Sequence, residues 1–170
     1  MGYDIADEAL RTATHRYPHV HFICGEFPAA CALRGQVFDV VVCSEAIEHV
    51  RDQAALIALV DQLLCTPGYL ILTCPNRLAE NHWWTDPKAG RQPVERWLTV
   101  RDIGSLLGSR FTVLSQESFV ADFPGWFFPR NRSALWARLV RRGLHTIGWD
   151  RVRAAMGYGL YLITCAEKRR

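Results

Sequence analysis

The sequence lacks the features of membrane-spanning, secreted and zinc-binding proteins. None of its apolar runs reaches the roughly 20 residues that cross a bilayer. Its six cysteines form no CxxC pair, which favours free thiols of a reducing compartment, several of them buried in strand-like runs. The first residues carry acids instead of a basic cluster before an apolar run. We therefore expect no signal peptide, no transmembrane segment and a cytoplasmic location.

Internal repeats and low-complexity linkers are also absent, so we expect a single domain over residues 1–170. The composition, 49% hydrophobic and 22% charged, is that of an ordinary globular protein. The net charge of +3 is unevenly spread, because residues 130–153 contain seven arginines and one acid. We interpret residues 120–156 as an aromatic and arginine-rich insertion.

Strand-like and helix-like segments alternate along the chain, which predicts an α/β fold with a largely parallel sheet. We expect helices over residues 7–16 and 54–64, and a third that begins at the N-cap Thr99 with Asp102 in capping-box position. The run Val40 to Val42 predicts a parallel strand that is covered on both faces. The other strands are expected at residues 2–4, 20–24, 69–74, 111–119 and 158–168.

Polar or special residues stand where the predicted strands end. Ligands of open α/β sheets bind at the carboxyl ends of the strands, so these residues are candidates for a binding site. They are Asp4, Glu26, Cys43 to Glu45, Pro75 and Asn76. For Asp4 two uses are open: a carboxylate that accepts two hydrogen bonds from a diol, or a helix N-cap.

Five stretches in order carry a family resemblance: "GYDIADEAL", "FICGEF", "FDVVVCSEAIEHV", "PGYLILTCPN" and "VERWLTVRDIGSLL". Over roughly residues 1–115 the chain resembles the class I S-adenosylmethionine-dependent methyltransferases. The resemblance implies a Rossmann-like methyltransferase sheet, mostly parallel with an antiparallel last strand. It also implies S-adenosylmethionine as the cofactor.

The resemblance assigns candidate residues to the cofactor. Asp4 looks like the acid that binds the ribose hydroxyls, and Glu26 and Phe27 look like the pair that borders the adenine. The turn at residues 43–44 looks like the one beside the methionine end. The full set expected to bind the cofactor is Asp4, Ile5, Glu26, Phe27, Cys43 and Ser44.

Three departures from the family pattern stand out. No strand and glycine-rich loop precede Met1, so we expect the domain to be N-terminally truncated, to bind the cofactor weakly and to self-associate through an exposed strand edge. The usual Pro-Gly-Gly is replaced by Pro67-Gly68-Tyr69. The third departure is the insertion at residues 120–156, whose aromatic residues suggest an aromatic or lipidic acceptor rather than nucleic acid.

The segment "EAIEH" offers catalytic groups. If the turn is helical, Glu45, Glu48 and His49 lie on one face, where they and His82 could bind a divalent metal. The alternative is that Glu45 lines the pocket while Glu48 and His49 order the turn. We expect no metal, and take His49 and Glu45 as the catalytic residues, with His49 as the general base for a hydroxyl acceptor.

These observations support one function over two alternatives. The first hypothesis is methyl transfer from S-adenosylmethionine to a small molecule, with O-methylation slightly favoured over N- and C-methylation. The second is a truncated, inactive copy of the fold that at most binds a partner. A nicotinamide-dependent oxidoreductase is disfavoured because no Tyr-x-x-x-Lys pair is present.

Overall fold

A computed structural model describes residues 1–27, 33, 35–78, 94–119 and 159–170. The predicted insertion at residues 120–156 and the candidate ligand His82 lie outside these residues. Among the described residues, no helix has both the length and the apolar character that crossing a membrane requires.

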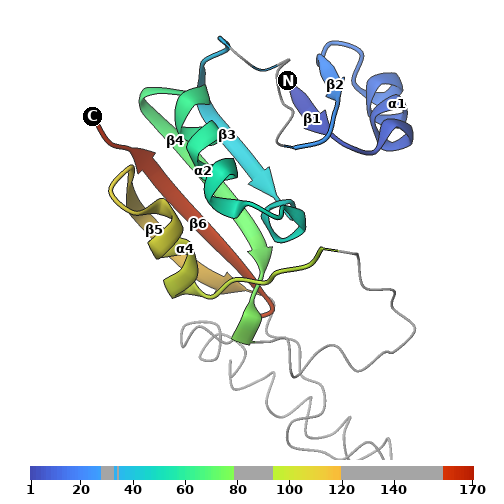
Figure 1. The fold of residues 1–170 in the computed structure, drawn as a ribbon. Coiled ribbons are helices and arrows are strands. Elements are labelled where there is room, and N and C mark those ends of the chain that lie inside the picture. Colours follow the sequence, from blue (N-terminus) through green and yellow to red (C-terminus); the bar gives the residue numbers. More distant parts are fainter. Residues whose placement is uncertain (28–32, 34, 79–93, 120–158) are drawn as a thin grey trace, which may run out of the picture.

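The main element is a four-stranded sheet with the order β3-β4-β6-β5 (Figure 1). Its strands are β3 (Phe38–Ser44), β4 (Leu64–Pro75), β5 (Phe111–Phe119) and β6 (Tyr161–Lys168). Strands β3 and β4 are parallel, whereas β6 is antiparallel to both β4 and β5. The predicted antiparallel last strand is therefore confirmed, and it lies between two earlier strands.

The N-terminal residues form a second, smaller sheet. Strands β1 (Gly2–Asp4) and β2 (Phe22–Cys24) pair in parallel and are connected through helix α1 (Asp7–Arg16). The bounds of α1 agree with the prediction, but only Leu10 of this helix is buried. Its N-cap is Ala6, whose side chain cannot accept a capping hydrogen bond.

Two helices and a 3-10 turn cover one face of the four-stranded sheet (Figure 1). They are α2 (Gln53–Leu63), α4 (Val100–Leu107) and the turn η2 (Ile47–His49). The Asp52 side chain caps α2 by accepting from the Ala55 N–H, and the predicted Thr99–Asp102 capping box begins α4. Their apolar faces and the strands beneath form the main core, which includes Ile47, Ile57, Leu70, Leu72, Ile103, Phe111 and Leu162.

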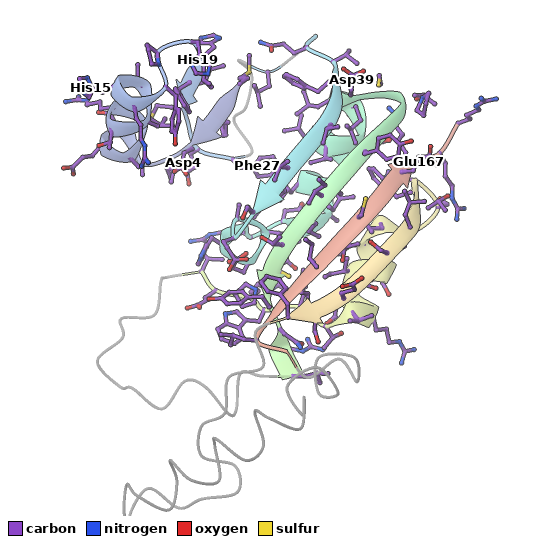
Figure 2. The ribbon with its side chains drawn as sticks, turned by 180° about the vertical axis from the view of Figure 1, so that it is seen from behind. Asp4, His15, His19, Phe27, Asp39 and Glu167 are labelled. Atoms are coloured by element: carbon purple, nitrogen blue, oxygen red, sulfur yellow. The ribbon has the colours of Figure 1, made fainter. Side chains whose placement is uncertain are left out.

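The opposite face of this sheet is not covered by the described helices, as Figure 2 shows from behind. Val40 and Val42 are 47% and 62% exposed, so the prediction that β3 is covered on both faces is wrong. An apolar β-branched run identifies the strand but does not report how many of its faces are packed. The described cysteines are free thiols, yet only Cys74 is buried, while Cys24 is exposed and Cys43, Cys65 and Cys165 are half-buried.

A second apolar cluster connects the small sheet with the main one. Leu33 and Leu63 form its buried part. Tyr3 and Ile23 of the small sheet pack against them together with Phe38 of β3. Through this cluster the small sheet packs beside β3.

Candidate functional site

The candidate residues gather at the carboxyl ends of two pairs of parallel strands. Pairing of β1 with β2 brings Asp4 beside Cys24 and Gly25. Pairing of β3 with β4 brings Ser44 beside Thr73. The strands thus end in polar residues, as the sequence predicted. One set of these residues lies on the small sheet and the other on the four-stranded sheet.

Asp4 is an exposed carboxylate at the tip of β1 (Figure 2). Its Oδ1 accepts a hydrogen bond from the Ala6 N–H at 2.8 Å, and its main-chain carbonyl accepts from the Gly25 N–H at 3.0 Å. The N-cap alternative is not borne out, because the N-cap of α1 is Ala6. The turn instead holds one carboxylate oxygen in place and leaves the side chain accessible to a ligand.

The other residues predicted to border the nucleoside differ in exposure. Ile5 is 65% exposed, so its side chain presents apolar surface beside the carboxylate. Glu26 is exposed, whereas Phe27 is half-buried and packs against the main core. Figure 2 shows Phe27 on the segment between β2 and β3. An exposed acid next to an anchored aromatic ring suits the polar edge and the flat face of a purine.

Cys43 and Ser44 end β3 with opposite orientations. Burial and, to a smaller extent, the nearby Glu48 raise the pKa of the Cys43 thiol to about 12, so this thiol stays protonated at neutral pH. Ser44 is exposed, and its Oγ lies 3.0 Å from Thr73 Oγ1 on the neighbouring strand. Of the two side chains, only that of Ser44 is exposed.

Glu45 follows with an unusual backbone. Its φ of 47° lies in the left-handed region, which costs a residue with a Cβ about 1–3 kcal/mol. Two contacts with Thr73 hold it there. The Glu45 N–H donates to the Thr73 carbonyl at 3.1 Å, and the Thr73 hydroxyl donates to Glu45 Oε1 at 3.0 Å.

The predicted common face of Glu45, Glu48 and His49 does not form. Only Ile47–His49 are helical, in a short 3-10 turn, and Glu45 lies outside it. Glu45 is exposed, whereas the Glu48 side chain is 2% exposed. The one-face expectation assumed an α-helix from Glu45 onward, and the left-handed Glu45 prevents that helix.

Hydrogen bonding orients the His49 ring. Its Nδ1 lies 3.1 Å from the Val94 carbonyl oxygen, which can only accept, so Nδ1 carries the proton. Nε2 is then the nitrogen that can take up a proton in the neutral ring. It lies 3.7 Å from Glu48 Oε1, and the imidazole is half-buried. This arrangement meets the tautomer requirement for a general base.

Glu48 is the most perturbed carboxyl group of the described residues. Its pKa is raised to about 7, mainly by burial and less by Glu45, against the lowering effects of a backbone hydrogen bond and of the nearby His49. Its Oε2 is buried without a hydrogen-bond partner in the described part of the chain. Near neutral pH, the Glu48 carboxyl group is therefore close to its own pKa, and its Oε1 lies beside His49 Nε2.

The chain around residues 94–97 fixes this pair in place. Arg96 donates its N–H to the Glu48 carbonyl at 2.8 Å. The buried Gln53 side chain donates to both the Ile47 and the Arg96 carbonyls, at 3.1 and 3.0 Å. Asn76 has a comparable structural role, since its buried Nδ2 donates to the Gly159 carbonyl at 2.7 Å and so joins the end of β4 to the start of β6.

No group of three or more His, Cys, Asp or Glu side chains able to hold a metal ion occurs among residues 1–27, 33, 35–78, 94–119 and 159–170. His82, the fourth ligand of the metal alternative, is not among them.

Comparison with known proteins agrees with the methyltransferase-like fold. Residues 1–72 match the family model described as "Methyltransferase domain". The chain is also 32% identical over 85 residues to a ubiquinone biosynthesis O-methyltransferase of Thiobacillus denitrificans, a match that covers 48% of this chain and 37% of the relative. By this match over residues 1–72 and by its fold, the chain is similar to the class I S-adenosylmethionine-dependent methyltransferases.

Solved structures extend the likeness over nearly the whole chain. The N-methyltransferase NodS of Bradyrhizobium japonicum, in complex with S-adenosyl-L-homocysteine, superposes with a TM-score of 0.60 at 11% identity, covering 99% of this chain and 65% of NodS. An S-adenosylmethionine-dependent methyltransferase of Mesorhizobium loti gives 0.59 at 17% identity, covering 98% and 78%. At these identities the likeness establishes the fold, and function must be argued from the site.

Thr73 is the site residue that sequence reasoning missed. It stands two residues before Pro75 in an apolar strand, and a threonine there is unremarkable. Alternation along β4 places it on the same side as Tyr69 and Ile71. Its relation to Ser44 and Glu45 depends on the β3–β4 register, which the sequence does not state.

Proposed function

We propose that this chain binds S-adenosylmethionine and forms part of an enzyme that transfers its methyl group to a small molecule, with a hydroxyl acceptor favoured. The observation that carries the proposal is the set of exposed or half-buried polar side chains at the ends of β1, β2, β3 and β4, in the fold of a methyltransferase. The O-methyltransferase relative supports a hydroxyl acceptor. The chain spans 37% of that relative's length, so its substrate is not transferred directly.

The residues at the strand ends have the chemistry that the cofactor needs. The accessible Asp4 carboxylate accepts from the ribose hydroxyls, beside the apolar surface of Ile5. Glu26 meets the amino group of the adenine and Phe27 packs on its face. The exposed Ser44 hydroxyl and the Cys43 main chain border the methionine end. When bound, S-adenosylmethionine supplies a methyl group made electrophilic by the sulfonium.

His49 is proposed to serve the acceptor, whereas Glu45, the other residue predicted to be catalytic, is proposed to act on the cofactor side of the site. With Nδ1 held by the Val94 carbonyl, His49 takes a proton on Nε2, and the neighbouring Glu48 stabilises the imidazolium that results. Glu45 places a carboxylate at the rim of the site. Cys43 is unsuitable as a base, because its thiol pKa is about 12.

The class of acceptor and the self-association of the chain are also proposed. We propose an aromatic or lipidic small molecule as the acceptor, because of the aromatic residues in the sequence of the 120–156 insertion. The single-domain organisation and the cytoplasmic location stay predictions. Self-association through a strand edge is also proposed, since β3 has only β4 as a partner among the described strands. Sedimentation at several concentrations measures it, and a monomer throughout would contradict it.

Calorimetry with S-adenosyl-L-homocysteine tests the proposed function. We expect the wild-type chain to bind and Asp4→Ala to lose about 1–3 kcal/mol of binding free energy, the usual loss for a hydrogen bond to a charged group. Asp7→Ala is a matched control, because Asp7 is also an exposed aspartate, three residues further along the chain, and pairs with Arg11 at 2.7 Å. Absence of binding by the wild type, or equal affinity of Asp4→Ala, would contradict the proposal.

A further inference from the structure

The ends of β3 and β4 contain a hydrogen-bonded chain of three side chains. Ser44 Oγ lies 3.0 Å from Thr73 Oγ1, and Thr73 Oγ1 donates to Glu45 Oε1 at 3.0 Å. Because the Thr73 hydroxyl has one proton and gives it to Glu45, Ser44 must be the donor in the first bond. The hydroxyl protons of Ser44 and Thr73 therefore both point toward the Glu45 carboxylate.

The main chain makes the same connection. The Glu45 N–H donates to the Thr73 carbonyl, so residue 73 holds residue 45 by both its backbone and its side chain. Glu45 adopts a φ of 47°, which a glutamate avoids unless its surroundings impose it. Strain of this kind persists only where the surrounding structure imposes it, and it occurs often at functional sites.

We infer that Thr73 is a positioning residue, whose hydroxyl fixes the Glu45 carboxylate as a subsite for the ammonium group at the amino-acid end of the cofactor. This inference rests on the proposed function. Glu45 is exposed, so its second oxygen can meet a ligand. It also follows directly after Ser44, which is expected beside the methionine end. An anionic side chain in that place suits an ammonium partner.

The alternative is that Thr73 merely supports the fold. Thr73 is half-buried and pairs with Ser44 and Ile163 in the sheet. In this alternative, a substitution acts by disturbing side-chain packing or strand pairing and not through the hydroxyl. Thr73→Val keeps the shape and the β-branch and removes only the hydroxyl. Thr73→Ser keeps the hydroxyl and removes only the methyl group. These two variants separate hydrogen bonding from packing.

Two ligands then separate the subsite from the rest of the cofactor pocket. S-Adenosyl-L-homocysteine carries the ammonium group, whereas 5′-methylthioadenosine has the same nucleoside without the amino-acid end. For Thr73→Val we expect about threefold weaker binding of the first ligand, as for a solvent-accessible ion pair, and unchanged binding of the second. Thr73→Ser should bind both like the wild type. Equal losses for both ligands, or no loss, would overturn the inference.

A double-mutant cycle completes the test. Glu45→Gln should weaken S-adenosyl-L-homocysteine binding at least as much as Thr73→Val does, and the double variant should lose no more than Glu45→Gln alone. Additive losses would mean that Thr73 does not act through Glu45. If the wild type binds neither ligand, the proposed function fails and the inference with it, whereas ligand-independent losses overturn the inference alone.

Discussion

The small N-terminal sheet and the four-stranded sheet differ in how they are stabilised. Helices α2 and α4 both have side-chain caps and pack a continuous core against β3 to β6. Helix α1 lacks a side-chain cap and buries only Leu10, and β1 and β2 have three residues each. Yet the residues expected to hold the nucleoside, Asp4 and Glu26, belong to the weakly packed region.

Because of this difference, we expect the two sheets to contribute differently to stability and to ligand binding. The tips of β3 and β4 hold Ser44, Glu45 and Thr73 on the well-packed sheet, where their geometry is fixed by strand pairing. Asp4 is fixed by a local turn through the Ala6 N–H. Substitutions in the main core should therefore unfold the protein, while those in the small sheet should change ligand affinity with little effect on the free energy of unfolding.

The largest effect on stability is expected from a substitution in the core of the four-stranded sheet. Leu70 is completely buried in β4, so Leu70→Ala should lower the free energy of unfolding by about 3 kcal/mol through lost contacts and a residual cavity. Ile5→Ala serves as the matched control, because Ile5 is 65% exposed in the small region. We expect it to cost less than about 0.5 kcal/mol. Urea denaturation measures both, and similar losses would show that the two regions are equally important for stability.

The next effect depends on pH and concerns the buried Glu48. Folding raises its pKa from 4.5 to about 7, so the folded protein keeps this proton while the unfolded chain releases it. Stability should therefore fall as pH rises between these values and then level off, by about 3 kcal/mol in total from this group. Glu48→Gln, which cannot ionise, should remove that loss.

Denaturation at pH 5 and pH 8 measures the Glu48 effect as a difference between wild type and variant. Glu117→Gln is the control, since Glu117 is exposed on β5. If Glu48→Gln and the wild type lose stability equally from pH 5 to pH 8, Glu48 is not the group responsible.

A smaller effect on stability is expected from changes at the N-caps of helices α4 and α1. Thr99 accepts from the Asp102 N–H, and Thr99→Ala should cost about 1 kcal/mol, the usual value of an N-cap. Ala6→Ser adds the missing cap to α1 and should raise the protection of α1 amides against hydrogen exchange. Unchanged exchange in α1 would mean that tertiary contacts, and not the cap, limit its stability.

The smallest expected effect is that of a chelator. We expect sub-stoichiometric divalent metal after purification without chelator, because Glu45 and Glu48 point into different environments, one exposed and one buried. Treatment with EDTA should then leave the melting temperature unchanged. Elemental analysis that finds one ion per chain, lost in Glu48→Ala, would contradict this and indicate a metal-assisted O-methylation.

The sequence predicted much of the fold because local signals were strong. The helix at Asp7–Arg16, the strand at Phe111–Phe119 and the Thr99–Asp102 capping box were all predicted as the structure has them. Each depends on periodicity or on residues three or four apart in the chain. The family resemblance then supplied the antiparallel last strand, whose place between β4 and β5 no local pattern reports.

The site was predicted less completely, and the reason is physical. Residue types alone placed Asp4, Glu26, Ser44, Glu45 and His49 near strand ends, because a buried strand that stops at a polar residue is visible in the sequence. Only the tertiary structure decided which of these residues are exposed. It also decided how the His49 ring is oriented and that Thr73 contacts Glu45. These facts depend on strand register and on a single left-handed residue, and both are set by contacts between segments about 30 or more positions apart.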